Sequence, residues 1–333
     1  IGNIFFIVND QTVIGNTVTS SDGLRPGLLA GESTDKASAV FYAGVNQSGN
    51  STDVLLGDGR IDQASILLNN QATLQGTMWL AYNADQLRDA FARVTGGQTI
   101  SLLSDINFRG LAIQPFEVRF MASETADELL YTVDFNGHTL SNFSITTANT
   151  PAALFVGKCM DGSATAPISG VTFRGIRVDN AEISCTGANF CSVLFNRFKG
   201  NISDIRLTNC KVGGSDIRNV GAISGSYVSG EVKDCVVDNC KIEGDRYVGI
   251  LFGSFSGVKA PSVTVDNCRI TGSSAIATEQ ASLDERGLAF GAVGSGTGTK
   301  PVLTLRNLTN EDNNPSEYYL GSKYKGGYSV VVQ

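Results

Sequence analysis

The sequence predicts an all-β protein built around a parallel β-helix, and three observations support this fold class. A pattern of about 28 to 30 residues recurs, marked by the pairs Asn209-Cys210, Asn239-Cys240 and Asn267-Cys268. Apolar and polar residues alternate within each unit, which is the periodicity of a strand. Glycines close most segments and allow tight turns. A fixed period of this length is typical of stacked units that bury their apolar faces against one another.

Stacking of equivalent positions would turn the marker pairs into ladders that run from coil to coil. Roughly 28 residues for each coil predict three short strands and three turns. The cysteines are expected to point inward as buried thiols, which behave as small apolar side chains. The expected structural ladder has these members: Cys210, Cys240, Cys268, Asn209, Asn239 and Asn267.

The chain order suggests three parts: residues 1–80, 81–308 and 309–333. The first part contains short β-rich runs bounded by Gly, Asn and Asp, so we expect a small β domain there. Residues 83–97 predict an amphipathic helix that caps the first coil, because their apolar positions follow helical spacing and Gly96-Gly97 ends them. The last part, which ends in SVVVQ, is expected to be a tail or closing strand.

Between the helix and residue 308 the sequence carries further motifs: QTISLLSDINF, VDFNGHTLSNFSI and repeated VG-x-x-x-G units. This order resembles the entry into right-handed parallel β-helices of secreted bacterial proteins. The VG-x-x-x-G units resemble the GLUG-type repeats of adhesin-like surface proteins of Bacteroides and its relatives. The resemblance implies a right-handed β-helix and a role in adhesion or ligand binding at a bacterial surface.

Composition excludes several classes of protein. The net charge is −7 and no basic cluster is visible, which argues against a nucleic-acid partner. No apolar run is long enough for a membrane-spanning helix. The chain begins at Ile1, which fits either a processed secreted protein or a truncated one.

The seven cysteines are an odd number, so at least one has no partner within the chain. Cys185 and Cys191 flank the turn CTGANFC and form either a local disulfide or two unpaired thiols. No two cysteines have the tight CxxC spacing typical of zinc sites. We therefore expect no metal and no cofactor.

Residues suited to catalysis are sparse. The single histidine, His138, lies in a predicted turn, so a Ser-His-Asp or Cys-His arrangement would have to use it. Asp204 with Asp234, or Asp238 with Asp266, would be neighbours on adjacent coils, about 4.8 Å apart. Paired carboxylates at such spacing serve glycoside hydrolysis. The motifs expected of pectate lyases and polygalacturonases are absent from the sequence, so we expect no enzyme.

Candidate ligand-binding residues border the repeat. Tyr227 and Tyr247 are flanked by polar residues and could present rings to a sugar or a protein. A polar insertion interrupts the repeat between Ile276 and Gly287, and insertions of this kind often form the binding face of a solenoid. Its candidate residues are Glu279, Asp284, Glu285 and Arg286.

The sequence therefore favours a secreted or surface-exposed binding protein whose partner is a carbohydrate or a host or neighbour surface protein. Two alternatives stay open. One is a structural subunit of a filament, virion or phage tailspike that self-associates through its terminal strands, GNIFFIV and SVVVQ. The other is a polysaccharide lyase or glycoside hydrolase of the β-helix type.

Overall fold

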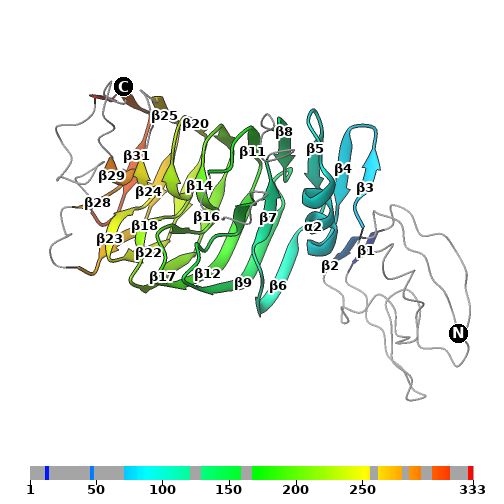
Figure 1. The fold of residues 1–333 in the computed structure, drawn as a ribbon, viewed down its shortest axis with the longest axis horizontal. Helices are drawn as coiled ribbons and strands as arrows, with labels where there is room; N and C mark the ends of the chain where they lie inside the picture. The colour runs from blue at the N-terminus through cyan, green and yellow to red at the C-terminus, as the bar shows by residue number, and fades with distance from the viewer. Residues whose placement is uncertain are drawn as a thin grey trace, which may run out of the picture.

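A computed structural model describes residues 12–14, 46–48, 71–120, 129–158, 167–255, 262–279, 285–293, 302–315 and 329–332. Within these residues the predicted fold class is confirmed, because parallel strands stack into an all-β solenoid with a helix near its N-terminal end (Figure 1). No helix in the described ranges is long and apolar enough to cross a membrane. Most of the predicted N-terminal β domain lies outside the described residues. Two short strands there, β1 (Thr12–Ile14) and β2 (Asn46–Ser48), pair in parallel.

Four sheets run along the solenoid. The first contains, in spatial order, β3 (Thr73–Gln75), β4 (Met78–Ala81), β5 (Thr99–Leu102), β8 (Tyr131–Asp134), β11 (Val171–Arg174), β15 (Ile202–Ser203), β20 (Gly230–Lys233), β25 (Ser262–Asp266), β30 (Val302–Arg306) and β32 (Ser329–Val332). The second contains β6 (Ile106–Ala112), β9 (Thr139–Ala148), β12 (Arg177–Thr186), β16 (Arg206–Thr208), β17 (Lys211–Ser215), β21 (Val236–Asp238), β22 (Lys241–Gly244), β26 (Arg269–Thr271), β27 (Ser274–Ala277) and β31 (Thr309–Glu311).

The other two sheets complete each coil. The third contains β7 (Phe116–Arg119), β10 (Phe155–Lys158), β14 (Phe195–Phe198), β19 (Ser224–Tyr227), β24 (Phe252–Phe255) and β29 (Phe290–Val293). The fourth contains β13 (Cys191–Ser192), β18 (Arg218–Gly221), β23 (Arg246–Gly249) and β28 (Arg286–Gly287).

One coil, from β20 to β24, has five short strands, so the predicted three strands for each coil are too few. The additional divisions come from residues with positive φ. Asp234 (φ 55°) separates β20 from β21, and Asn239 (φ 50°) separates β21 from β22. A left-handed residue turns the chain without a loop, so alternation alone does not reveal these corners.

Coil length also varies more than the marker pairs suggest. Ile202 pairs with Val232, which is 30 residues later, and Val232 pairs with Val265, which is 33 residues later. The lengthening arises between the third sheet and the first, and it is partly offset by a shorter connection elsewhere in the coil. Tyr227 pairs with Phe255 and Gly230 pairs with Val263, so the connection from the third sheet to the first is five residues longer in the later coil.

The predicted helix is confirmed as α2 (Ala84–Arg93), which covers the start of the solenoid (Figure 1). The Asn83 side-chain oxygen accepts a hydrogen bond from the backbone N–H of Gln86 at 2.9 Å and so caps the helix. Leu87 and Phe91 are buried, and the Phe91 ring lies 5.8 Å from that of Phe155. The Arg88 guanidinium donates to the carbonyl oxygen of Pro115 at 2.8 Å, which fixes the helix to the next segment.

Stacked aromatic rings form the centre of the core. Phe195, Phe198, Phe252 and Phe290 are fully buried, and the last two have their centroids 4.8 Å apart. These phenylalanines therefore belong to the core.

Both ends of the described solenoid carry strands that lie outside the predicted β-helix range. Strand β4 pairs in parallel with β5 and buries Trp79, so the first sheet extends to residues before 81. In the tail, β31 pairs with β26 and β32 pairs with β30. The tail strand therefore joins the sheet of its own chain.

Candidate functional site

Four asparagines on successive coils form a column that we call the amide ladder: Asn142, Asn180, Asn209 and Asn239. The Asn180 Nδ2 donates to the Asn142 Oδ1 at 2.8 Å, and the Asn239 Nδ2 donates to the Asn209 Oδ1 at 2.7 Å. The Asn209 Nδ2 donates to the Asp179 Oδ1 at 2.9 Å. Two of the three steps between successive members are therefore direct hydrogen bonds between amides, and at the step from Asn180 to Asn209 the Asn209 amide bonds to Asp179 instead.

The backbone explains why asparagine recurs at these positions. The four residues have φ between 50° and 57°, in the left-handed region that asparagine tolerates better than most residues. The column continues with Gly272 (φ 55°) and Asp312 (φ 54°), since β26 pairs with β21 on one side and β31 on the other. Gly272 thus meets the same backbone requirement, but it contributes no amide.

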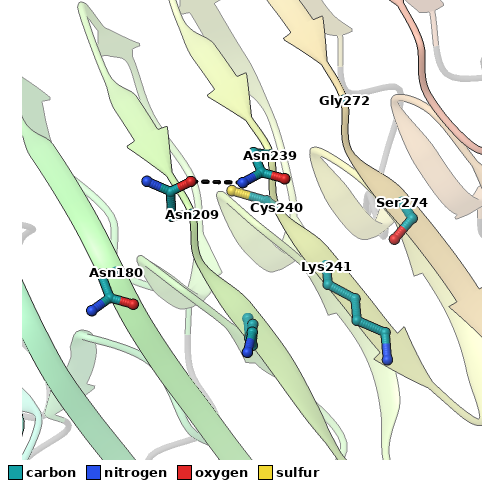
Figure 2. A pocket seen from close by; sticks show the side chains of 8 residues that line it. Asn180, Asn209, Asn239, Cys240, Lys241, Gly272 and Ser274 are labelled. Atoms are coloured by element: carbon teal, nitrogen blue, oxygen red, sulfur yellow. Dashed lines mark hydrogen bonds between the residues drawn. The ribbon is translucent and has the colours of Figure 1, made fainter.

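Absence of a side chain at Gly272 interrupts the ladder. Within the described residues, the Asn239 Oδ1 accepts no hydrogen bond, whereas the Asn209 Oδ1 accepts one from Asn239. A Cβ placed on Gly272 would have only Asn239 backbone atoms near it, at 4.0 Å. Figure 2 shows the Asn209–Asn239 hydrogen bond and, next to Asn239, the segment between β26 and β27 that contains Gly272.

A hollow of about 350 Å³ lies at this interruption, and we call it the ladder gap. It is lined by Asn180, Asn209, Lys211, Asn239, Cys240, Lys241, Gly272 and Ser274. These residues come from adjacent coils of the second sheet (Figure 2). The lining therefore offers amides, ammonium groups and a hydroxyl, with no aromatic ring.

Two lysines are the charged residues that line the ladder gap. Lys211 and Lys241 are in register on adjacent strands, and both are exposed. The Lys241 ammonium lies 2.7 Å from a carboxylate oxygen of Glu243, whereas within the described residues Lys211 has no carboxylate oxygen within 4.0 Å. Glu182 is in register with Lys211 on the preceding coil. The local charges are thus two lysines and two glutamates, of which Lys211 and Glu182 form no close ion pair.

Sequence reasoning missed the ladder gap, although part of its signal was visible. A lysine follows the marker pair in the first two units, as NCKV and NCKI. The strand register is needed to see that Gly272 occupies the position where the next asparagine of the column would stand.

Tyr227 was predicted to lie on the surface, and this prediction is wrong. Its side chain is fully buried, and its ring stacks between those of Phe198 and Phe252. The hydroxyl donates to the carbonyl oxygen of Gly200 at 2.5 Å. Burial raises its pKa well above the usual value, and the ring cannot reach a ligand.

The structure brings three of the predicted residues together around Arg246, which the sequence did not single out. The Arg246 guanidinium forms two hydrogen bonds with the fully buried Glu285, at 2.8 and 3.0 Å. Its Nε lies 3.8 Å from Glu279, and its charged group lies 5.0 Å from the centroid of the Tyr247 ring. Glu285 therefore holds the end of the insertion onto the preceding coil. It is not an exposed ligand-binding carboxylate, which corrects that expectation.

The remaining two candidate residues of the insertion are Arg286 and Asp284. Arg286 lies in β28 and is partly buried, and Asp284 lies outside the described residues.

The predicted ladder is correct in its first two rungs and wrong in its third. Asn209 with Asn239, and Cys210 with Cys240, occupy equivalent positions. Asn267 instead donates to the Asp234 side chain at 2.6 Å. The longer coil places the residue 33 positions after Cys240 beside it, so Ser273, five residues beyond the marker Cys268, takes the position next to Cys240.

The inward cysteines form two stacked pairs instead of one ladder. All four are buried: Cys210, Cys235, Cys240 and Cys268. A hydrogen bond between thiols links Cys210 with Cys240, and another links Cys235 with Cys268. The hydrogen bond to Cys210, together with burial, raises the pKa of Cys240. The sequence left open whether Cys185 and Cys191 are bonded to each other, and in the structure they form a disulfide.

Of the two carboxylate pairs considered for catalysis, only one consists of neighbours on adjacent coils. Asp204 and Asp234 are neighbours in register, because Ser203 pairs with Lys233. Asp204 is held by Arg177 at 2.6 Å and Asp234 by Asn267, so both belong to structural contacts.

Asp238 and Asp266 are not neighbours, because Asp238 pairs with Thr271 and Asp266 pairs with Lys233. The single histidine, His138, lies 3.1 Å from the Asp105 carboxylate in a turn, as its position suggested. Across the described ranges no cluster of His, Cys, Asp and Glu suits a metal ion.

Comparison with known proteins leaves the family open. No protein-family model and no curated protein matches the chain, so the resemblance to GLUG-type repeats stays a hypothesis. Among solved structures, the chain is similar to a putative immunoglobulin A1 protease from Bacteroides ovatus. The identity is 17% and the TM-score 0.45, over 72% of this chain and 68% of that one. At these values the similarity carries no argument about activity.

Proposed function

We propose that this protein is a non-catalytic binding protein that takes a carbohydrate at the ladder gap. The observation that carries the proposal is the interruption of the amide ladder at Gly272, which leaves the Asn239 Oδ1 without a neighbouring amide. Sugar hydroxyls both donate and accept hydrogen bonds. The amide oxygen, the ammonium groups and the Ser274 hydroxyl that border the hollow match them.

The lining residues support binding without catalysis. Hydrolysis of a glycosidic bond usually requires two carboxyl groups about 5 to 10 Å apart. The eight residues that line the ladder gap include no Asp, Glu or His. The sulfur of Cys240 is a poor nucleophile, because its raised pKa keeps it protonated.

A secreted or cell-surface location belongs to the same proposal. The Cys185–Cys191 disulfide supports an oxidising compartment, since disulfides are rare in reducing ones. An adhesin-like role is consistent with the resemblance of the VG-x-x-x-G units to repeats of bacterial surface proteins. The partner would then be a glycan on a host or neighbouring surface.

The test combines a glycan array with an assay for newly released reducing ends on the same sugars. Gly272→Asn is the decisive variant, because asparagine tolerates φ 55° and its amide would continue the ladder into the hollow. The matched control is Gly76→Asn in the turn between β3 and β4, where φ is 60° and an added Cβ would meet nothing within 4 Å.

We expect the natural protein and the Gly76→Asn variant to bind the same glycans without cleaving them. Gly272→Asn should fold normally and lose this binding. Release of reducing ends would overturn the non-catalytic assignment. Unchanged binding by Gly272→Asn would show that the ladder gap is not the site.

A further inference from the structure

The charged residues at the ladder gap indicate which class of sugar would bind there, and this inference rests on the proposed function. Lys241 is balanced by Glu243 at 2.7 Å, but Lys211 has no carboxylate oxygen within 4.0 Å in the described part of the chain. The two ammonium groups also stand on adjacent strands in register, where like charges destabilise a sheet. No described contact within the fold makes use of the Lys211 charge.

The lining also excludes one common way of binding neutral sugars. No aromatic side chain borders the ladder gap, so a pyranose ring cannot stack there. A neutral hydrogen bond contributes only about 0.5 to 1.5 kcal/mol after competition with water, whereas one to a charged group contributes about 1.5 to 3 kcal/mol. Affinity at this hollow is therefore best supplied by a ligand that carries a negative charge.

The Asn239 Oδ1 adds a second requirement, because a side-chain amide oxygen only accepts hydrogen bonds. The ligand must present a donor toward Asn239 and an anion toward Lys211. An acidic sugar has both on one ring, as hydroxyl groups and a carboxylate or sulfate. Glu182 and Glu243 stand beside the two lysines, so the anion must be directed at Lys211 and away from these carboxylates.

We infer that the ladder gap binds an acidic saccharide whose anionic group pairs with Lys211 while a hydroxyl donates to Asn239. Carboxylate and sulfate share this chemistry, and two matched pairs of probes distinguish them. The first pair is a hyaluronan oligosaccharide and its carboxyl-reduced form. The second is a dextran sulfate oligosaccharide and the corresponding dextran.

Affinities are measured by titration calorimetry for the natural protein, Lys211→Gln and Gly272→Asn. We expect one charged probe to bind about two- to fivefold more tightly than its neutral partner at low salt, which is the gain from one exposed ion pair. Lys211→Gln should remove this preference, so that the charged and neutral probes of the pair bind equally tightly. Lys199→Gln, which lies outside the lining, should keep the preference. Raising the salt concentration should weaken only the charged probe.

The outcomes separate this inference from the proposed function. If neither charged probe binds more tightly than its neutral partner, the inference is overturned. If in that case Gly272→Asn still abolishes glycan binding, the proposed function stands without it. Loss of the charge preference in Lys199→Gln as well as in Lys211→Gln would place the anion elsewhere and would also overturn the inference.

Discussion

Glu285 on one coil accepts two hydrogen bonds from Arg246 on the preceding coil, and the carboxylate is fully buried while the arginine side chain is 26% exposed. This difference in exposure makes the two partners unequal. Without Glu285 the guanidinium can turn toward water, but without Arg246 the carboxylate stays buried. Hence the loss of stability should depend on which partner is removed.

We expect Arg246→Ala to lower the free energy of unfolding by about 3 kcal/mol and Glu285→Ala by about 1 to 2 kcal/mol. The double variant Arg246→Met with Glu285→Met should cost less than Arg246→Ala, because it removes both charges. Urea unfolding followed by circular dichroism provides the values. Equal losses for the two single variants would contradict the asymmetric burial.

The amide ladder predicts an unusual order of stability. Asn209 has φ 55°, where alanine is strained by about 1 to 2 kcal/mol and glycine is not. Both replacements lose the hydrogen bonds to Asp179 and Asn239. We therefore expect Asn209→Gly to be more stable than Asn209→Ala by about 1 kcal/mol in chemical denaturation.

A neighbouring position serves as the control for this order. Lys211 lies in β17 and is absent from the residues with positive φ. There alanine should be the more stable replacement, by about 0.5 to 1 kcal/mol. The same order at both positions would show that left-handed backbone is not what selects asparagine.

The sequence was sufficient for the fold class, because period and alternation are local signals that every coil repeats. The apolar spacing within residues 83–97 also located α2. The number of strands in a coil was not accessible, since a single left-handed residue such as Asn239 makes a corner without any loop.

The site was harder to predict, because it depends on register. A spacing of 28 residues between Asn239 and Asn267 suggested equivalence, but five additional residues before β25 and two fewer between β22 and β23 place Gly272 beside Asn239. Changes in connection length that offset one another cannot be detected from the sequence unless the pairing of the strands is known. Arg246 was missed for a related reason, since its partner Glu285 is distant in sequence.

Burial of Tyr227 should make the protein sensitive to alkali. Its pKa is raised well above the usual value of about 10, so the folded state keeps the proton while the unfolded chain loses it. The stabilisation is complete below pH 10 and declines as the pH rises beyond it. Tyr227→Phe lacks this proton and should lose less stability there.

Urea unfolding at pH 9 and pH 11 provides the measurement. At pH 9 Tyr227→Phe should be less stable by about 1 kcal/mol, because it lacks the hydrogen bond to Gly200. By pH 11 the difference in unfolding free energy should change by about 1.4 kcal/mol in favour of Tyr227→Phe, which cancels or reverses it. The buried thiols and Tyr131 titrate in both proteins, so their contribution cancels in the comparison. A difference independent of pH would refute the assignment.

Reduction of Cys185–Cys191 should destabilise the solenoid by a moderate amount. The disulfide closes a short loop, with a sequence separation of 6, and a loop of this size corresponds to about 2 kcal/mol in the chain-entropy description. We expect the double variant Cys185→Ser with Cys191→Ser to unfold at lower urea concentration by this amount. Reductant should shift the natural protein to the same midpoint and leave the double variant unchanged. A further shift of the double variant would point to another reducible bond.

The capping role of α2 can be tested at Phe91, which is 1% exposed and contacts Phe116 and Phe155. Phe91→Ala should lower the free energy of unfolding by about 3 to 5 kcal/mol, whereas Phe91→Leu should cost less because it leaves a smaller cavity. If the helix seals the first coil, hydrogen exchange in Phe91→Ala should rise first in β5 and only later in β25. Uniform acceleration along the solenoid would instead indicate that the coils unfold as one unit, since each coil of a repeat protein is stabilised mainly by its neighbours.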